Sequence, residues 1–479
     1  MYLIGNGYLI THDPSLPFMK NGAVLIEGDA VRDVGDTGKL SKAYPKAQFI
    51  DAEGGVIMPG LINAHTHFYS AALRGYSVPG FHPGCFADVL LMRSWRLDRE
   101  LDFRDTVNAA YASAMEAVKN GVTTVFDHHA GYGSVSGSLM GVAGAAGAVG
   151  LRACCCFETS CRLGYSDEKA AEEENENFIA FCEKQPSGML KAMFGLHAPF
   201  TLTESSLKSC AARNAGRTGF HIHVSESGDD AFVSTHTFGQ LPAELLKNCG
   251  ILGGRTILAH CVHTTESELD TIAESGSFVV NNPQSNMSNA VGCADAKTML
   301  SKGIKLCLGT DNFTPDMLES ARAFITAQRD KTGDPSFGLN EAAKLLFENN
   351  RLLAEEYFGK GIGTIKPGAP ADIIIMDYKP YTPMDESNYP AHVLMGMSGR
   401  NCVFTMAAGR ILTQKSCRIP RQLLFAPFCA PTSGTHFNYS TVLAFSTSAI
   451  ALFLIGIRQF LLLPNSTITS SSVMSRMTP

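Results

Sequence analysis

The chain has 479 residues, 45% of them apolar and 18% charged, so it is able to bury a sizeable core and is not disordered overall. At roughly 100–200 residues per domain, this length predicts two to three domains. The formal net charge of -6 lacks the basic excess of a nucleic-acid-binding surface, and no nucleic-acid partner is expected.

The cysteines and the first residues indicate the compartment. None of the fourteen cysteines lies in a CxxC spacing, which argues against a zinc ribbon or a thioredoxin-type redox site. Free thiols are typical of a reducing compartment. Residues Met1 to Asp13 contain no basic stretch followed by an apolar core, so a secretory signal is not expected and the predicted localisation is cytoplasmic.

Short alternating segments at the two ends of the chain predict one β-sandwich around a middle domain. The early segments are Met1–Ile10, Gly22–Glu27, Ala30–Val34 and Gln48–Asp51. The late segments are Ala371–Asp377, Cys402–Ala407 and Arg410–Thr413.

The middle of the chain alternates apolar, strand-like runs with helix-like segments, which predicts an α/β fold with a (β/α)8 TIM barrel. The runs are Val56–His65, Thr123–Asp127, Leu151–Phe157, Ala192–His197, Gly219–Val224, Thr256–His260, Ser277–Asn281 and Lys305–Asp311. The helix-like segments are Asp105–Lys119, Asp167–Glu183, Glu204–Ala215, Thr265–Glu274 and Ala294–Ser301. The predicted domains are residues 1–57 and 362–416 for the sandwich and 58–361 for the barrel.

Residues that bind metals recur where these predicted strands end. They are His65 with His67, His197, His223, His260 and Asp311. The C-terminal ends of barrel strands meet at one mouth, so these side chains are expected to converge. Because residues i and i+2 of an extended chain share a face, His65 and His67 are placed to bind one cation together.

Three imidazoles and one carboxylate suit zinc with a water at an open position, and iron remains an alternative because such ligands do not separate the two metals strongly. Glu226, three residues after His223, is placed to shuttle protons. His260 is either a ligand or a neighbour of the site. We interpret His221 as a hydrogen-bonded interior residue and leave the roles of His128, His129 and His263 open.

Six segments carry a family resemblance: PGLINAHTH at Pro59–His67, HxHxxE at His221–Glu226, AHCVH at Ala259–His263, NNPQSNMSNAVG at Asn281–Gly292, GTDN at Gly309–Asn312 and PGAPADIIIMD at Pro367–Asp377. The sequence resembles the amidohydrolase superfamily over residues 1–413. Within it, the chain is similar to the single-metal branch of cytosine-, guanine- and S-adenosylhomocysteine-deaminase-like enzymes and triazine hydrolases, and most of all to SsnA-type aminohydrolases.

The resemblance implies roles for individual residues. His65, His67, His223 and Asp311 would hold one divalent ion, Glu226 would shuttle the proton, and His260 would orient the attacking water. His197 would contact the substrate. The implied catalytic residues are therefore Glu226, His260 and Asp311.

The predicted function is hydrolysis of a non-peptide C–N bond, by deamination of a purine, pyrimidine or triazine-like ring. The alternatives are loss of another group, such as chloride or a cyclic amide, on the same scaffold, or a barrel that has become a non-catalytic scaffold. The expected partners are a small heterocyclic substrate and water. Assembly into a homo-oligomer is left open.

The chain departs from the family after about Ser416. From Phe425 onward its only charged residues are Arg458 and Arg476. For residues 417–479 three interpretations compete: a membrane anchor, a disordered extension, or translation in the wrong reading frame. The abrupt loss of acidic residues favours the third, and membrane association is not expected.

Overall fold

Strands from both ends of the chain form one mixed sheet, as the sequence predicted. We describe the chain from a computed structural model, which covers residues 1–185 and 187–414. The sheet has the order β17-β16-β15-β5-β1-β2-β3, with β4 paired to β1. Its strands are β1 (Tyr2–Ile10), β2 (Phe18–Glu27), β3 (Ala30–Asp36), β4 (Gln48–Asp51), β5 (Val56–Pro59), β15 (Ile373–Met376), β16 (Cys402–Ala407) and β17 (Arg410–Gln414).

This sheet has a core of its own. Buried side chains from early and late strands, among them Ile4, Val24, Ile57, Ile375 and Phe404, form one apolar cluster. Burial of such side chains removes apolar surface from water and holds the two chain ends together. The helix α1 (Thr37–Ala43) packs against β1, β2 and β3, whereas α16 (Tyr389–Gly396) and the 3-10 helix η5 (Gly399–Asn401) lie against α13 (Met317–Thr332).

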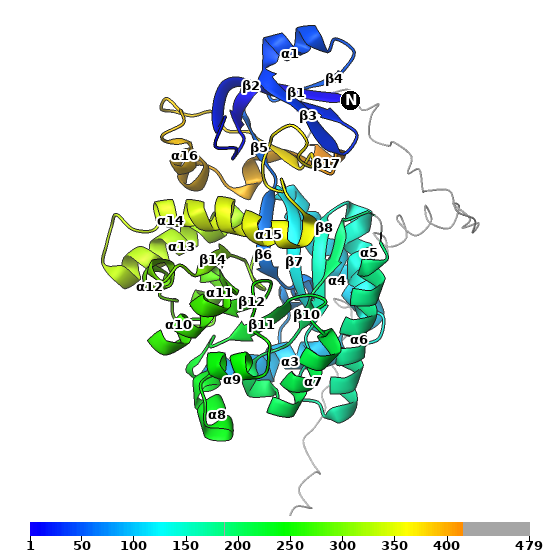
Figure 1. The fold of residues 1–479 in the computed structure, drawn as a ribbon, viewed down its shortest axis with the longest axis vertical. Coiled ribbons are helices and arrows are strands. Elements are labelled where there is room, and N and C mark those ends of the chain that lie inside the picture. The colour runs from blue at the N-terminus through cyan, green and yellow to red at the C-terminus, as the bar shows by residue number, and fades with distance from the viewer. Residues whose placement is uncertain (186, 415–479) are drawn as a thin grey trace, which may run out of the picture. The chain divides into compact units, whose positions relative to one another are not determined.

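The middle of the chain forms the predicted (β/α)8 barrel (Figure 1). Its parallel strands follow chain order. They are β6 (Leu61–Thr66), β7 (Val122–His129), β8 (Arg152–Phe157), the short pair β9 (Leu190–Ala192) and β10 (Phe194–Gly195), β11 (Phe220–Val224), β12 (Ile257–His260), β13 (Phe278–Asn281) and β14 (Lys305–Leu308).

The barrel closes between its first and last strands. A parallel bridge joins Thr66 to Asp311. Below it, the buried Asn350 side chain donates to the carbonyl oxygens of Ile62 and Leu308, at 2.8 Å each, and accepts from the Leu308 amide at 2.9 Å. Asn350 therefore links the first and last strands of the barrel through three hydrogen bonds.

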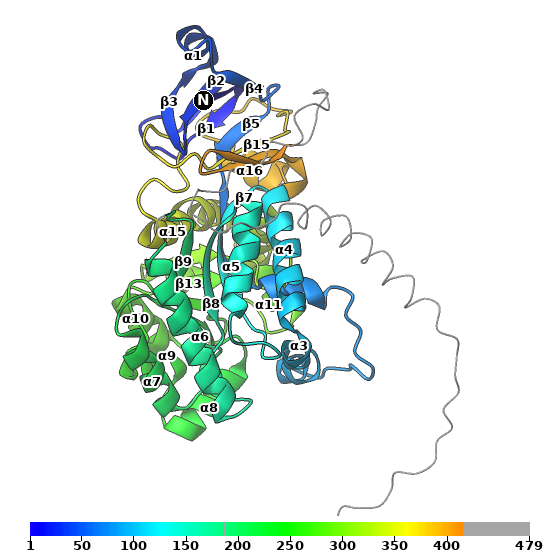
Figure 2. The same ribbon diagram turned by 90° about the vertical axis from the view of Figure 1, so that its right-hand side faces the viewer.

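Helices surround the barrel and its mouth. Those between β6 and β11 are η1 (Phe68–Leu73), α2 (Phe86–Val89), the π-helical turn η2 (Leu90–Ser94), α3 (Trp95–Glu100), α4 (Phe103–Lys119), α5 (Ser138–Val149), α6 (Tyr165–Glu183), η3 (Pro199–Thr201) and α7 (Glu204–Asn214). The later ones are α8 (Gly228–Phe238), α9 (Pro242–Asn248), α10 (Glu266–Ser275), α11 (Pro283–Ser288), α12 (Ala296–Ser301), α13 (Met317–Thr332), α14 (Leu339–Ala343), η4 (Lys344–Asn349) and α15 (Asn350–Phe358). Figure 2 shows α4, α5 and α6 side by side along one flank.

One detail of the sequence prediction was wrong. The run Val56–His65 is not one strand, because β5 pairs with β1 and β15 in the mixed sheet and only β6 belongs to the barrel. The chain passes between the two sheets at Gly60, where a Cβ would lie 2.2 Å from the Thr123 hydroxyl.

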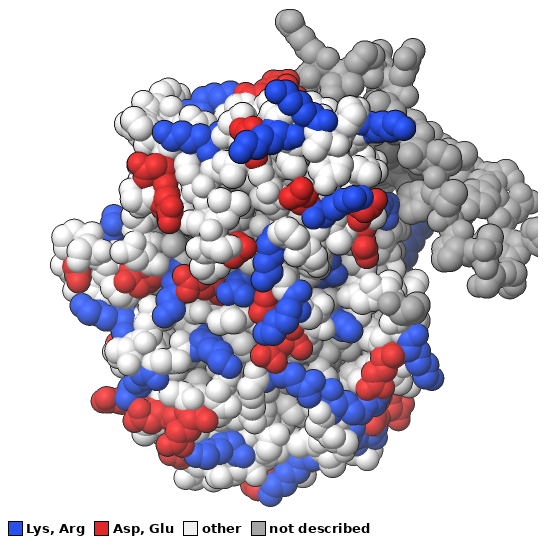
Figure 3. All heavy atoms as spheres, turned by 45° about the horizontal axis from the view of Figure 1, so that its top comes forward, with Lys and Arg blue, Asp and Glu red and all other residues white. Residues whose placement is uncertain are grey.

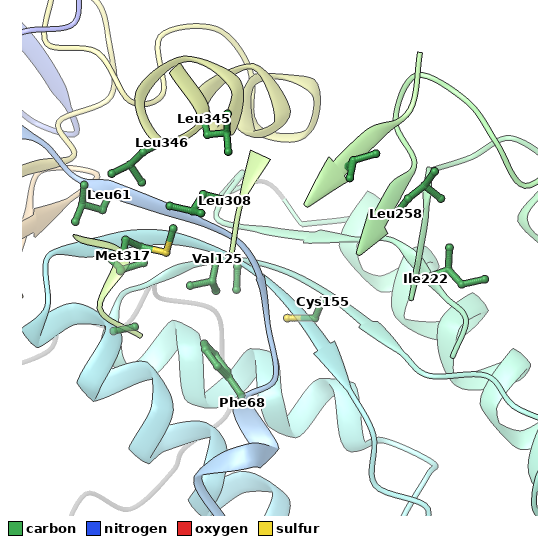
Figure 4. Close-up of a cluster of buried hydrophobic side chains, with 14 of the residues drawn as sticks. Leu61, Phe68, Val125, Cys155, Ile222, Leu258, Leu308, Met317, Leu345 and Leu346 are labelled. Carbon is green, nitrogen blue, oxygen red and sulfur yellow. The ribbon is translucent and has the colours of Figure 1, made fainter. Parts of the chain in front are cut away.

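The barrel strands separate two apolar layers. Leu61, Val125, Cys155, Ile222 and Leu258 belong to the large cluster that also contains helix residues (Figure 4). Cys154 and Cys156 belong instead to a cluster of strand residues closed by Leu353 and Ile362. The three consecutive cysteines thus alternate between the two layers, as period-2 strand geometry requires, and all three are free thiols.

A buried ion pair links the barrel to the mixed sheet. Arg152, at the start of β8, lies 3.1 Å from the Asp372 carboxylate, and both side chains are buried. Asp372 also accepts a hydrogen bond from the Ala408 amide at 2.7 Å.

The surface carries charges of both signs. On the face shown in Figure 3, Lys and Arg side chains are interspersed with Asp and Glu.

The expectations for residues 417–479 lie outside the described residues. Among the helices that the structure does describe, none is long and apolar enough to span a membrane.

Candidate active site

The strand ends bring their metal-binding side chains together at the barrel mouth. His65 on β6, His223 on β11, His260 at the end of β12 and Asp311 after β14 each offer a ligand atom. These four atoms all lie within 4.8 Å of one another, and all four residues are buried. The site is therefore assembled from positions that are up to 246 residues apart in sequence.

His67 lies against the same group. Its Nε2 atom is 2.9 Å from Asp311 Oδ1 and 3.2 Å from His223 Nε2. In the four-residue group, however, the third imidazole is that of His260, and His67 groups instead with His128 and His223. The four ligands implied by the resemblance, His65, His67, His223 and Asp311, thus meet at one place with His260.

The hydrogen bonds around the imidazoles leave ligand atoms free. The Nδ1 atoms of His67 and His223 face the carbonyl oxygens of His128 and His197, at 2.5 and 2.9 Å. A ring that donates from Nδ1 to a carbonyl keeps its Nε2 lone pair for a metal. His65 Nδ1 lies 2.8 Å from His221 Nε2, so His221 is the hydrogen-bonded interior residue that the sequence suggested.

Two buried ring nitrogens without hydrogen-bond partners in the described part of the chain indicate that a cation fits this site. The Nε2 atoms of His65 and His260 have no hydrogen-bond partner among the described residues. An unpaired polar atom in a protein interior costs free energy that a bound ion would recover. Three or four imidazole nitrogens with one carboxylate form a donor set that fits a borderline divalent cation.

The backbone is strained at the ends of three strands. Ser225, His260 and Asp311 have φ values of 49°, 77° and 54°, in the left-handed region that residues with a Cβ rarely occupy. At these positions the chain leaves the strand direction and turns its side chains toward the mouth. Such strain is characteristic of sites that the surrounding structure holds in place.

Glu226 adjoins the cluster without belonging to it. Its Oε2 atom lies 3.6 Å from His260 Nε2, and its Oε1 atom accepts from Asn289 Nδ2 at 3.3 Å. Burial raises the pKa of Glu226, because the charged form loses hydration. A carboxyl group with a raised pKa beside a cation site is suited to accept and return a proton.

Sequence reasoning missed a set of polar residues on α11. Ser285 Oγ donates to Asp311 Oδ2 at 2.5 Å, and Asn286 Oδ1 lies 2.7 Å from His260 Nδ1. With Asn289, these residues hold the Asp311, His260 and Glu226 side chains. The spacing 285, 286 and 289, directly after a barrel strand, is the helical pattern that could have revealed them.

A cavity of about 630 Å³, which includes its open mouth, adjoins the cluster. His67, His223, Glu226 and Asp311 line one part of it. His197, Trp95, Glu158 and Asp98 line another part, so His197 is exposed to any molecule that enters. His263 instead faces the Val291 carbonyl at 2.7 Å and does not line this cavity.

Comparisons with known proteins identify the family of the chain. A sequence model of the amidohydrolase family matches residues 56–412. A 5'-deoxyadenosine deaminase from Methanothermobacter thermautotrophicus is 30% identical over 406 residues, covering 82% of this chain and 90% of the relative. A 5-methylthioadenosine/S-adenosylhomocysteine deaminase from Moorella thermoacetica is 30% identical over 411 residues, covering 83% and 90%.

A similar fold occurs in a crystal structure of an adenosine deaminase from Xanthomonas campestris with bound zinc. The two structures align with a TM-score of 0.76 at 20% identity, over 86% of this chain and 93% of that chain. At this level of identity the similarity concerns the fold.

Proposed function

The chain belongs to the amidohydrolase family, and from this premise we propose that it is a metal-dependent aminohydrolase acting on an amino-substituted heterocycle. The relatives named above are deaminases of adenosine derivatives, which makes the purine ring of a nucleoside the first substrate class to test. Residues 58–361 would carry the catalysis.

We assign the metal site to His65, His67, His223 and Asp311, with zinc as the proposed ion. His260 would remain beside the ion, because its Nε2 atom lies between the carboxylates of Glu226 and Asp311, at 3.6 and 3.9 Å. A divalent ion bound here would supply Lewis acidity and lower the pKa of a coordinated water.

The residues of the chain would then move the protons. Asp311 accepts a proton from the attacking water, and His260 holds that water toward the ring carbon. Glu226 donates a proton to the adjacent ring nitrogen, which makes the carbon electrophilic. The proton on Asp311 passes to the amino group, and the C–N bond breaks to release ammonia. The proton of the added hydroxyl returns to Glu226, which regenerates its carboxyl group and leaves a carbonyl on the ring.

The observation that carries this proposal is the row of Glu226, His260 and Asp311 at the histidine cluster. The three residues come from three different strand ends, and His260 Nε2 lies 3.6 Å from Glu226 Oε2 and 3.9 Å from Asp311 Oδ2. Acid-base catalysis needs groups within reach of one reacting atom, and this line provides them.

Ammonia release tests the proposal. Zinc-loaded protein is incubated with adenosine, 5'-deoxyadenosine, S-adenosylhomocysteine, guanine and cytosine, and ammonia is measured together with bound zinc. We expect release from at least one of these compounds. Absence of ammonia from all five, at one bound ion per chain, would contradict the proposed substrate class.

A further inference from the structure

Glu158 is a charged side chain in the cavity wall that the proposed reaction does not use. It follows the last residue of β8, lines the cavity and is 3% exposed. Its position one residue past a strand end is the same kind of position that the catalytic groups occupy. Unlike the proposed catalytic groups, Glu158 lies on the part of the cavity wall that His197 and Trp95 also line.

Arg162 holds the Glu158 carboxylate in place. Arg162 Nη1 donates to Glu158 Oε1 at 2.5 Å, and Nη2 donates to Asp98 Oδ2 at 2.6 Å. The guanidinium carbon also lies 5.2 Å from the Trp95 ring centre and 4.7 Å from that of Tyr132. Arg162 therefore fixes the position of the Glu158 carboxylate in the cavity wall and is itself held by Asp98 and the two rings.

The Glu158 carboxylate retains capacity for a ligand. A carboxylate has about four acceptor positions. Among the described residues, the Arg162 guanidinium is the only hydrogen-bond donor to this side chain. The neighbouring ring atoms, His128 Nδ1 at 3.7 Å and His197 Nε2 at 3.9 Å, lie beyond hydrogen-bond distance.

His197 fixes where that ligand would sit. Its Nδ1 atom is tied to Thr201 Oγ1 at 2.8 Å, which leaves Nε2 facing the cavity. Glu158 Oε1 therefore lies next to the ring atom that is placed to contact the substrate. A substrate atom bound by His197 would bring its neighbouring atom to Glu158.

We propose that Glu158 is a specificity-determining residue that accepts a hydrogen bond from a donor group on the substrate, adjacent to the ring edge at His197. An ionised carboxylate accepts and does not donate, so the site selects an N–H or O–H group and disfavours an acceptor there. The donor has two possible sources, a sugar hydroxyl of a nucleoside or the ring N–H of a free base. This inference rests on the proposed function.

Binding to an inactive protein tests the inference. Zinc-loaded Glu226→Gln protein, with and without Glu158→Gln, is titrated calorimetrically with two pairs of probes. Adenosine is compared with 2',3'-dideoxyadenosine, and adenine with 9-methyladenine. Within the pair that binds, we expect loss of the donor to weaken binding by about 10- to 150-fold when Glu158 is present, and by less than 3-fold in Glu158→Gln.

The control for this experiment is Glu172→Gln. Glu172 is a fully buried carboxylate held by Arg213 Nε at 2.9 Å, and it does not line the cavity. Glu172→Gln should lower thermal stability as Glu158→Gln does. The variant should still bind the probe that carries the donor group more tightly than the probe that lacks it. If loss of the donor group weakens binding equally with Glu158 present and in Glu158→Gln, the proposed role of Glu158 is wrong. Failure of all four probes to bind would instead contradict the proposed substrate class.

Discussion

Replacing Ser285 with alanine removes the hydroxyl that donates to Asp311 Oδ2 at 2.5 Å. Ser285 and Asp311 are 1% and 5% exposed, so water does not replace the lost donor easily. A hydrogen bond to a charged group contributes about 1.5–3 kcal/mol. Asp311 keeps its contact with His67 at 2.9 Å, so the site persists in weakened form.

We therefore expect Ser285→Ala to bind zinc about 10- to 100-fold more weakly, since about 1.4 kcal/mol corresponds to a factor of ten. Competition with a chromogenic chelator measures this affinity. Ser277→Ala is the control, because it removes a buried hydroxyl that donates to the Gly253 carbonyl at 3.1 Å, at the start of β13. Zinc affinity of Ser285→Ala within twofold of wild type would refute the reasoning.

Three further predictions concern the site and the fold. Glu226→Gln should retain one bound ion but lose at least about 100-fold in kcat, measured by ammonia release with metal analysis; near-normal turnover would remove Glu226 from the mechanism. Chelation of the metal should abolish ammonia release and lower the Tm, and added zinc should restore both; a Tm insensitive to the chelator would mean that the folded state does not bind the ion. Asp372→Ala leaves Arg152 buried without its partner and should lower the free energy of unfolding by about 3–5 kcal/mol in denaturant titrations while zinc affinity stays unchanged. A change below 1 kcal/mol would show that this pair does not stabilise the fold.

The barrel and the histidine cluster were predictable because both follow from local pattern. Alternating runs and helical segments indicated the parallel strands, and strand-end logic placed His65, His223 and Asp311 at one mouth. The mixed sheet was predictable for the same reason, since its strands show alternation at both chain ends. The division of the run Val56–His65 at Gly60 was not predictable from the sequence, because it depends on how closely Thr123 approaches the backbone.

The supporting residues depend on tertiary geometry. Ser285 and Asn286 lie on α11 and Asn289 directly follows it, so their direction depends on where this helix begins, at Pro283. Glu158 lies one residue beyond the predicted strand end at Phe157, but its contacts with Arg162 and His197 depend on how the chain folds. The positive φ of His260 brings its ring into the tight group, and no sequence pattern reports that backbone angle.

An anomalous diffraction map collected at the zinc absorption edge, from crystals of zinc-loaded protein, tests the central claim most directly. The account predicts one strong peak per chain, within bonding distance of His65, His67, His223 and Asp311. A peak held instead by Glu158, His197 and His223, or no peak in this cluster, would contradict it.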